Sequence, residues 1–222
     1  MNFLGHALLA GPDPAMRLGG MLGDFVKGPL PAGLPHDVAA GVLLHRRIDS
    51  FTDRHAAFRA SRERVSLVRR RYAGIMIDLF YDHFLARRWE EFSVQPLGEF
   101  SADTYALMAA RADLLPAALA RILPAMRETD WLSSYRSIEA TGRALDRIAA
   151  HRLRRPNPLA GAIAELGGAY EDFASDFAAF IGDAQCYARQ TLSAIAAPPS
   201  ERGGGTTQDW NSMRRPDRHD DT

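Results

Sequence analysis

Apolar residues recur at helical spacing along most of this chain, whereas the alternating apolar and polar runs that are typical of strands are nearly absent. No Asn-Gly hairpin turn occurs, and alanine is abundant. The pattern predicts helices over 1–10, 15–26, 36–50, a segment from Thr52 or Asp53 to 72, 74–92, a region from Ser101 interrupted by Pro116 and Pro124, 129–150 and 158–195. A cluster of proline and glycine predicts a loop over 28–35.

The same pattern predicts the fold class and the domain boundaries. Helices without strands predict an all-α, single-domain helical bundle over residues 1–196. From Ala197 onward the composition changes to Pro-Pro, a Gly-Gly-Gly run and polar residues. Such a segment buries too little apolar surface to fold alone, so a disordered tail is expected over 197–222.

Composition adds limited information about class and location. The chain has 222 residues, of which 46% are hydrophobic, so it can form a substantial core. Its 27 basic and 27 acidic side chains cancel, so overall charge argues neither for nor against a nucleic-acid partner. One cysteine, Cys186, cannot form an internal disulfide. No apolar run approaches the ~20 residues that span a bilayer, and we therefore expect a soluble, cytoplasmic protein without a membrane partner.

Histidine and aspartate gather within the first 85 residues at helical spacing. His45 and Asp49 are four residues apart, as are Asp78 and Asp82, so each pair shares one helix face. Carboxylates among apolar neighbours are rarely buried unless they are paired or bind a metal. Imidazole and carboxylate together suit manganese, iron or zinc. The expected ligands of a divalent metal are His6, Asp24, His45, Asp49, Asp82 and His83. Buried hydrogen-bonded pairs without a metal are the open alternative.

Arginine is concentrated in a second segment. Six arginines and one glutamate, Glu63, give residues 59–71 a net charge of +5. In an otherwise neutral chain this segment predicts an electropositive face that attracts an acidic partner. We expect Arg69, Arg70 and Arg71 to contribute to it. From charge alone, a nucleic acid and a merely solvated helix stay open.

Several separated motifs resemble one known family. They are Asn2-Phe3-Leu4-Gly5-His6, Gly23-Asp24-Phe25-Val26-Lys27-Gly28, His45-Arg46-Arg47-Ile48-Asp49 with Thr52-Asp53, Asp82-His83-Phe84-Leu85 and Trp131-Leu132-Ser133-Ser134-Tyr135-Arg136. In order and spacing they look like acyl carrier protein phosphodiesterase over roughly residues 1–195. That family is similar to the all-helical HD group of metal-dependent phosphohydrolases, so an HD-like bundle is expected. Where members often have a second N-terminal histidine, this chain has Leu8.

The resemblance implies a reaction. The family cleaves the phosphodiester between phosphopantetheine and a serine of holo-acyl carrier protein, an acidic partner, usually with manganese; nucleic acid is then not expected as a partner. The catalytic residues implied are Asp24, Asp78, His45 and Arg46, with Asp24 or Asp78 orienting the water. Lys27 and Arg47 are implied phosphate contacts. Two alternatives stay open: an HD-type hydrolase of nucleotides or other small phosphodiesters, and a non-catalytic helical module that binds an acidic partner.

Overall fold

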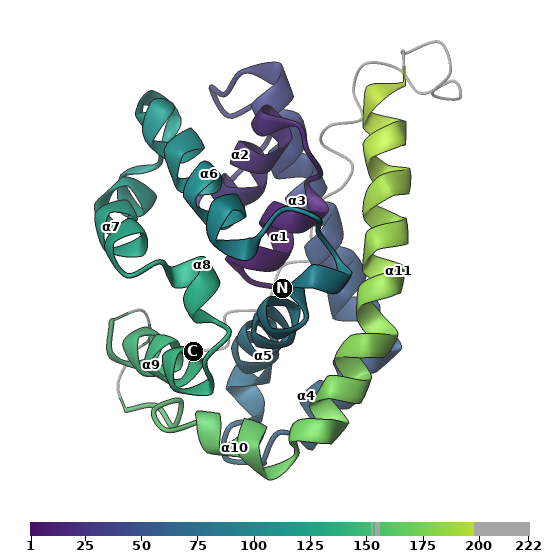
Figure 1. The fold of residues 1–222 in the computed structure, drawn as a ribbon, viewed down its shortest axis with the longest axis vertical. Coiled ribbons are helices and arrows are strands. Elements are labelled where there is room, and N and C mark those ends of the chain that lie inside the picture. The colour runs from purple at the N-terminus through teal and green to yellow at the C-terminus, as the bar shows by residue number, and fades with distance from the viewer. Residues whose placement is uncertain (152, 154–155, 198–222) are drawn as a thin grey trace.

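The computed structural model describes residues 1–151, 153 and 156–197, and these residues form helices with no strand (Figure 1). The helices are α1 (Phe3–Leu9), α2 (Pro14–Leu22), α3 (His36–Arg54), α4 (Ala56–Arg64), α5 (Ala73–Arg87), α6 (Leu97–Ala110), α7 (Ala117–Glu128), α8 (Trp131–Ser134), α9 (Ile138–His151), α10 (Ile163–Gly168) and α11 (Tyr170–Ala196). Short 3-10 helices span Arg70–Tyr72, Trp89–Glu91 and Ala112–Leu114. The all-α prediction is confirmed. The predicted tail lies, apart from Ala197, outside the described residues.

Helix α5 runs through the middle of the molecule (Figure 1). It is apolar on nearly every side, as expected of a helix enclosed by others. It packs against α1, α4, α9 and α11. Phe80, Tyr81 and Phe84 of α5 pack against aromatic residues of the long helix α11, including Phe173 and Phe177. This core fixes the position of α1, whose start lies against α5.

The contact between α2 and α3 is unusually close. A Cβ atom added to Gly19 would lie 2.6 Å from the Cα atom of Gly41 and 2.3 Å from the carbonyl oxygen of Val38. Only glycine at both positions lets the two backbones touch in this way. The close approach places the end of α2 directly beside the second half of α3, where the functional side chains lie.

Two predicted helix boundaries near the site were wrong. Helix α3 continues through Thr52 and Asp53 and ends at Arg54, and the break falls at His55, whose ring accepts a hydrogen bond from the Ala57 amide. Histidine thus replaces the expected Thr or Asp cap. Helix α4 ends at Arg64 and not at 72, because the chain turns there and the Ser66 amide donates to the Glu165 carboxylate.

Later boundaries also differ from the prediction. Pro124 lies inside α7 without interrupting it. The predicted helix over 129–150 is two helices, because Asp130 adopts a left-handed backbone (φ 40°) and caps α8, and Ser137 caps α9 through the Ala140 amide. The segment predicted over 158–195 divides into α10 and α11 at Ala169. Such local capping contacts are weakly encoded in hydrophobic periodicity.

Candidate metal centre

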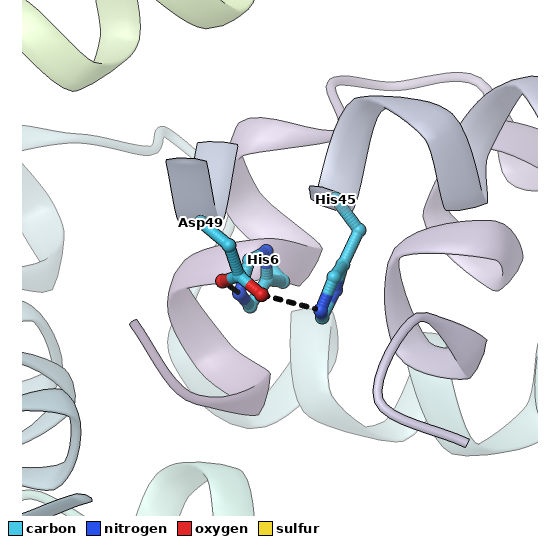
Figure 2. A group of neighbouring side chains, drawn as sticks. All are labelled: His6, His45 and Asp49. Atoms are coloured by element: carbon cyan, nitrogen blue, oxygen red, sulfur yellow. Dashed lines mark ion pairs between the residues drawn. The ribbon is translucent and has the colours of Figure 1, made fainter. Parts of the chain in front are cut away.

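Three of the predicted ligands meet between α1 and α3. His6 projects from α1, and His45 and Asp49 project from one face of α3 (Figure 2). The His6 Nε2 atom lies 3.0 Å from Asp49 Oδ1, and the His45 Nε2 atom lies 3.4 Å from Asp49 Oδ2. The two imidazole rings stack with their centroids 3.6 Å apart. Asp24, which follows α2, approaches His45 Nε2 to 3.7 Å.

The end of α2 fixes the orientation of His45. The His45 Nδ1 atom hydrogen-bonds the Gly20 carbonyl oxygen at 2.8 Å, so Nδ1 is the nitrogen that keeps its proton when the ring is neutral. The Nε2 atom is thereby turned toward Asp24 and Asp49. A Cβ atom at Gly23 would lie 2.1 Å from the His45 ring, so only glycine fits at that position. The arrangement is the usual one for a ligating histidine, whose second nitrogen donates to a carbonyl oxygen.

Electrostatics make the cluster an anionic site. Burial lowers the pKa of His45, but the carboxylates of Asp24 and Asp49 together have a larger, opposite effect and bring this pKa to about 9. Burial and the charge of His45 lower the pKa of His6 to about 4. Burial raises the pKa of Asp49, but the two imidazoles hold this pKa well below its usual range. Burial also raises the pKa of Asp24, but hydrogen bonding and charge from His45 lower it to about 2. Two carboxylates and one imidazolium therefore coexist at neutral pH.

The donor set fits a divalent cation. One ligand atom from each of His6, His45 and Asp49 lies within 4.8 Å of the others. Within the described part of the chain, both ring nitrogens of His6 and the Nε2 atom of His45 are buried and make no hydrogen bond of regular geometry, although both Nε2 atoms lie near the Asp49 carboxylate. Buried polar atoms are normally satisfied, so atoms left in this state indicate a ligand. Two imidazoles and a carboxylate suit a divalent transition metal.

A cleft of about 280 Å³ opens beside the cluster. The residues that line it are Met1, Asn2, Asp24, Lys27, Asp49, Thr52, Asp53 and Asp78. Lys27 is an exposed residue of the segment that follows α2. The cleft thus combines carboxylates, of which Asp24 and Asp49 approach the two imidazoles, with a cation that can meet an anionic substrate.

The sequence of the chain matches a known group of proteins over most of its length. A family model described as acyl carrier protein phosphodiesterase matches residues 1–184. The chain belongs to the acyl carrier protein phosphodiesterase family. No solved structure matches the chain significantly. The relation to HD-type hydrolases stays a prediction, because neither the family match nor the helical fold tests it.

Relatives with that name cover most of the chain. The acyl carrier protein phosphodiesterase of Serratia proteamaculans is 33% identical over 179 residues, which are 80% of this chain and 92% of the relative. Those of Enterobacter sp. and Escherichia coli O45:K1 are 34% and 36% identical, and each alignment covers 69% of this chain and 80% of the relative. The described helices include none that is long and apolar enough to cross a membrane.

The structure places Asp78, Asp82 and His83 of this family member outside the cluster. Asp78 lines the cleft, where its carboxylate accepts a bond of 2.7 Å from the Met1 amino group. Asp82 is fully buried and accepts hydrogen bonds from the Leu4 and Gly5 amides at the start of α1. Burial raises the pKa of Asp82 to about 7.

His83 makes two protein contacts that occupy its ring. Its Nδ1 atom lies 2.7 Å from the Tyr135 carbonyl oxygen, and its Nε2 atom lies 3.0 Å from the Tyr170 hydroxyl. The adjacent Asp82–His83 pair therefore binds the helix α1 backbone on one side and two tyrosines on the other. In the structure these two residues hydrogen-bond within the protein, and the metal ligation expected of them stays a prediction.

The basic residues predicted to contact phosphate differ in their positions relative to the cleft. Arg46 donates to the carbonyl oxygens of Val26 and Gly28, and so holds the segment that carries Asp24 and Lys27. The structure thus gives Arg46 a positioning contact, and its catalytic role stays a prediction. Arg47 is partly buried and does not line the cleft. Lys27 is the predicted cation that lies at the cleft.

The arginine segment is partly neutralised within the protein. Arg69 pairs with Glu165 at 3.1 Å, and Arg64 pairs with Asp176 at 2.9 Å. Arg70 donates to the carbonyl oxygens of Val65 and Glu63, which leaves its charge uncompensated by these bonds. Arg71 is exposed. Fewer arginines of this segment therefore contribute positive charge to the surface than the sequence predicted.

Sequence reasoning did not assign roles to several residues of the site. Gly20 and Gly23 orient His45, and Asn2 and Thr52 line the cleft. A signal for the glycines was present, because Gly19, Gly20 and Gly23 cluster in and just after a short helix. Without the position of α3, that clustering could not be connected to His45.

Proposed function

We propose that this chain hydrolyses the phosphodiester that joins phosphopantetheine to a serine of holo-acyl carrier protein, giving apo-carrier protein and free phosphopantetheine. One observation carries the proposal: in this chain, which belongs to the acyl carrier protein phosphodiesterase family, His6, His45 and Asp49 converge beside a cleft. A cytoplasmic site of action is part of the proposal, since the exposed thiol of Cys186 suits a reducing compartment.

Each residue of the cleft has a distinct part in this reaction. His6, His45 and Asp49 would hold a divalent metal, which we propose to be Mn²⁺ from the mixed nitrogen and oxygen donors. Such an ion lowers the pKa of water and neutralises phosphoryl charge. Asp24, which is ionised and half exposed, accepts a hydrogen bond from the attacking water and orients it. Lys27 offers its charge to the phosphate.

An exposed stripe connects the cleft to the arginine segment. In the first half of α5, Gly74, Ile75 and Asp78 are partly exposed whereas Ala73, Met76 and Ile77 are buried. Together with exposed Arg71, the spacing of three and four residues places the partly exposed positions on one helix face. Asp78 lines the cleft, so the face leads from the cleft to Arg71.

The turn over residues 66–69, which precedes this stripe, carries two exposed apolar side chains. Leu67 is 85% exposed and Val68 is 74% exposed. The turn is held in place because Ser66 and Arg69 both bond Glu165. Arg70 and Arg71 follow this apolar pair and form no ion pair with the described residues. A preorganised apolar pair next to two such arginines suits a protein partner that is acidic and partly apolar. We propose that the carrier protein contacts this stripe while its modified serine enters the cleft.

Mass spectrometry of holo-carrier protein tests the proposal. With Mn²⁺ we expect loss of the phosphopantetheine mass, and with excess chelator we expect none. Asp49→Asn should abolish the loss, because it weakens the metal cluster. Asp183→Asn is the matched control, since it alters a His–Asp pair on the surface, with His55 Nε2 3.2 Å from Asp183. It should leave turnover unchanged.

Three results would contradict the proposal. Folded protein that leaves holo-carrier protein intact with every divalent metal would refute the reaction. Equal turnover of Asp49→Asn and the parent protein would refute the site. Faster turnover of a nucleotide phosphodiester than of holo-carrier protein would favour the small-substrate hydrolase.

A further inference from the structure

The hydroxyl of Thr52 is buried in the cleft without a partner. Thr52 is 2% exposed and lines the cleft, and its Oγ1 atom makes no hydrogen bond to any described residue. It lies three residues after Asp49, on the same side of α3. A buried hydroxyl without a partner is destabilising, so its retention indicates a ligand that supplies the missing bond.

Three other threonines of the chain make a hydroxyl–carbonyl hydrogen bond that Thr52 does not make. A threonine in a helix can donate its hydroxyl to the carbonyl oxygen four residues earlier. Thr104 donates to Phe100, Thr129 to Ala125 and Thr141 to Ser137, at 2.8–3.1 Å. Thr52 does not bond Ile48 in this way. Its hydroxyl is therefore available to a molecule in the cleft.

Most other donors at the cleft are engaged. The Met1 amino group donates to Asp78, and the Asn2 side-chain amide donates to the Tyr135 hydroxyl. The cleft also contains the carboxylates of Asp24, Asp49, Asp53 and Asp78, which accept and do not donate when ionised. An anionic group that enters the cleft therefore finds donors at Lys27 and Thr52, in addition to the remaining N–H groups of Met1 and Asn2.

We propose that Thr52 donates a hydrogen bond to a non-bridging phosphoryl oxygen of the bound phosphodiester and stabilises the charge that develops there. This inference rests on the proposed function for its substrate, but the phosphoryl group it recognises is tested separately. The hydroxyl is fixed on a helix beside Asp49, so it needs little reorganisation during the reaction. Loss of one such donor lowers kcat by roughly 100-fold or more.

The variant Thr52→Val removes the hydroxyl and preserves the side-chain shape. For the Mn²⁺-loaded protein we would measure kcat and KM on holo-carrier protein, the affinity for Mn²⁺, and the affinity for inorganic orthophosphate by calorimetry. We expect a fall in kcat, weaker orthophosphate binding and unchanged Mn²⁺ affinity. Thr52→Ser should restore both properties. Thr129→Val is the control, because its hydroxyl bonds Ala125 away from the cleft.

Each other outcome is decisive. Unchanged kcat and orthophosphate affinity in Thr52→Val would overturn the inference. Equal losses in Thr52→Ser and Thr52→Val would also overturn it, since a packing role of the methyl group would then explain both, and so would a loss of Mn²⁺ affinity in Thr52→Val. If the parent protein fails to cleave holo-carrier protein but Thr52→Val still weakens orthophosphate binding, the proposed substrate fails and the phosphoryl contact stands.

Discussion

The Nδ1 atom of His45 lies 2.8 Å from the carbonyl oxygen of Gly20, and this bond decides which nitrogen of the ring can bind a metal. It directs the Nε2 atom toward Asp24 and Asp49. The bond exists because α2 and α3 touch through Gly19 and Gly41. A metal-binding geometry in α3 thus depends on small residues in a neighbouring helix.

Gly23→Ala should therefore damage the site. The new Cβ atom would lie 2.1 Å from the His45 ring, so the imidazole must rotate away from Asp24 and Asp49. We expect Mn²⁺ affinity to fall roughly 10- to 100-fold, as when support of a ligating histidine is lost. Calorimetric titration measures it.

Gly182→Ala provides the matched change. Position 182 lies in α11, where an added Cβ meets nothing within 4 Å. Here alanine should preserve Mn²⁺ affinity and stabilise the helix by about 0.5–1 kcal/mol. Similar Mn²⁺ affinities in the two variants would show that Gly23 does not constrain His45.

Metal binding should release a proton. The pKa of His45 is raised to about 9, so its ring is protonated at neutral pH in the metal-free protein, whereas His6, with a pKa of about 4, is neutral. A ligating imidazole must lose the proton at Nε2. We expect affinity to rise roughly tenfold per pH unit up to about pH 9. Calorimetry in buffers of different ionisation enthalpy counts the protons, and a count near zero at pH 7 would contradict the assignment.

The same shift has a consequence for the metal-free protein. The folded-state pKa of His45 lies above the ordinary value of 6.5, so folding is favoured by protonation. The stability that His45 contributes is fully present below pH 6.5 and is lost as the pH rises through about 9. Denaturant titrations with chelator should show this decline, and His45→Gln should remove it.

Asp82→Ala should destabilise the fold without changing the number of bound metal ions. The substitution leaves the buried amides of Leu4 and Gly5 without their acceptor, at a cost of about 1–3 kcal/mol for each amide. Chemical denaturation measures the loss, and mass spectrometry under native conditions counts the Mn²⁺ ions. A variant of parent stability that binds less metal would place Asp82 among the ligands after all.

Charge reversal at Arg71 should weaken recognition of the carrier protein. Arg71 is exposed at the end of the stripe that leads to the cleft, so Arg71→Glu should raise KM several-fold and reduce the dependence of KM on salt. Arg121→Glu makes the same charge change on exposed α7, in a separate part of the molecule (Figure 1), and should have little effect. Equal KM values in all three proteins would remove the stripe from the interface.

Hydrophobic periodicity was sufficient to predict an all-α fold and the approximate positions of most helices. It failed where a side chain ended or capped a helix, as His55, Asp130 and Ser137 do, because those bonds involve single residues and leave no periodic trace. The pairing of His45 with Asp49 followed from local geometry alone, since four residues along a helix return to the same face.

Only the tertiary structure decided which of the other histidines and aspartates join that pair. His6 reaches it because α1 packs beside α2 and α5, whereas Asp82 and His83, in similar apolar surroundings, turn to α1 and to two tyrosines. The sequence by itself determined the helices and the spacing of residues within each of them. The packing of separate helices brought His6, Asp24 and Thr52 to His45 and Asp49, because contacts between distant segments depend on how whole surfaces fit together.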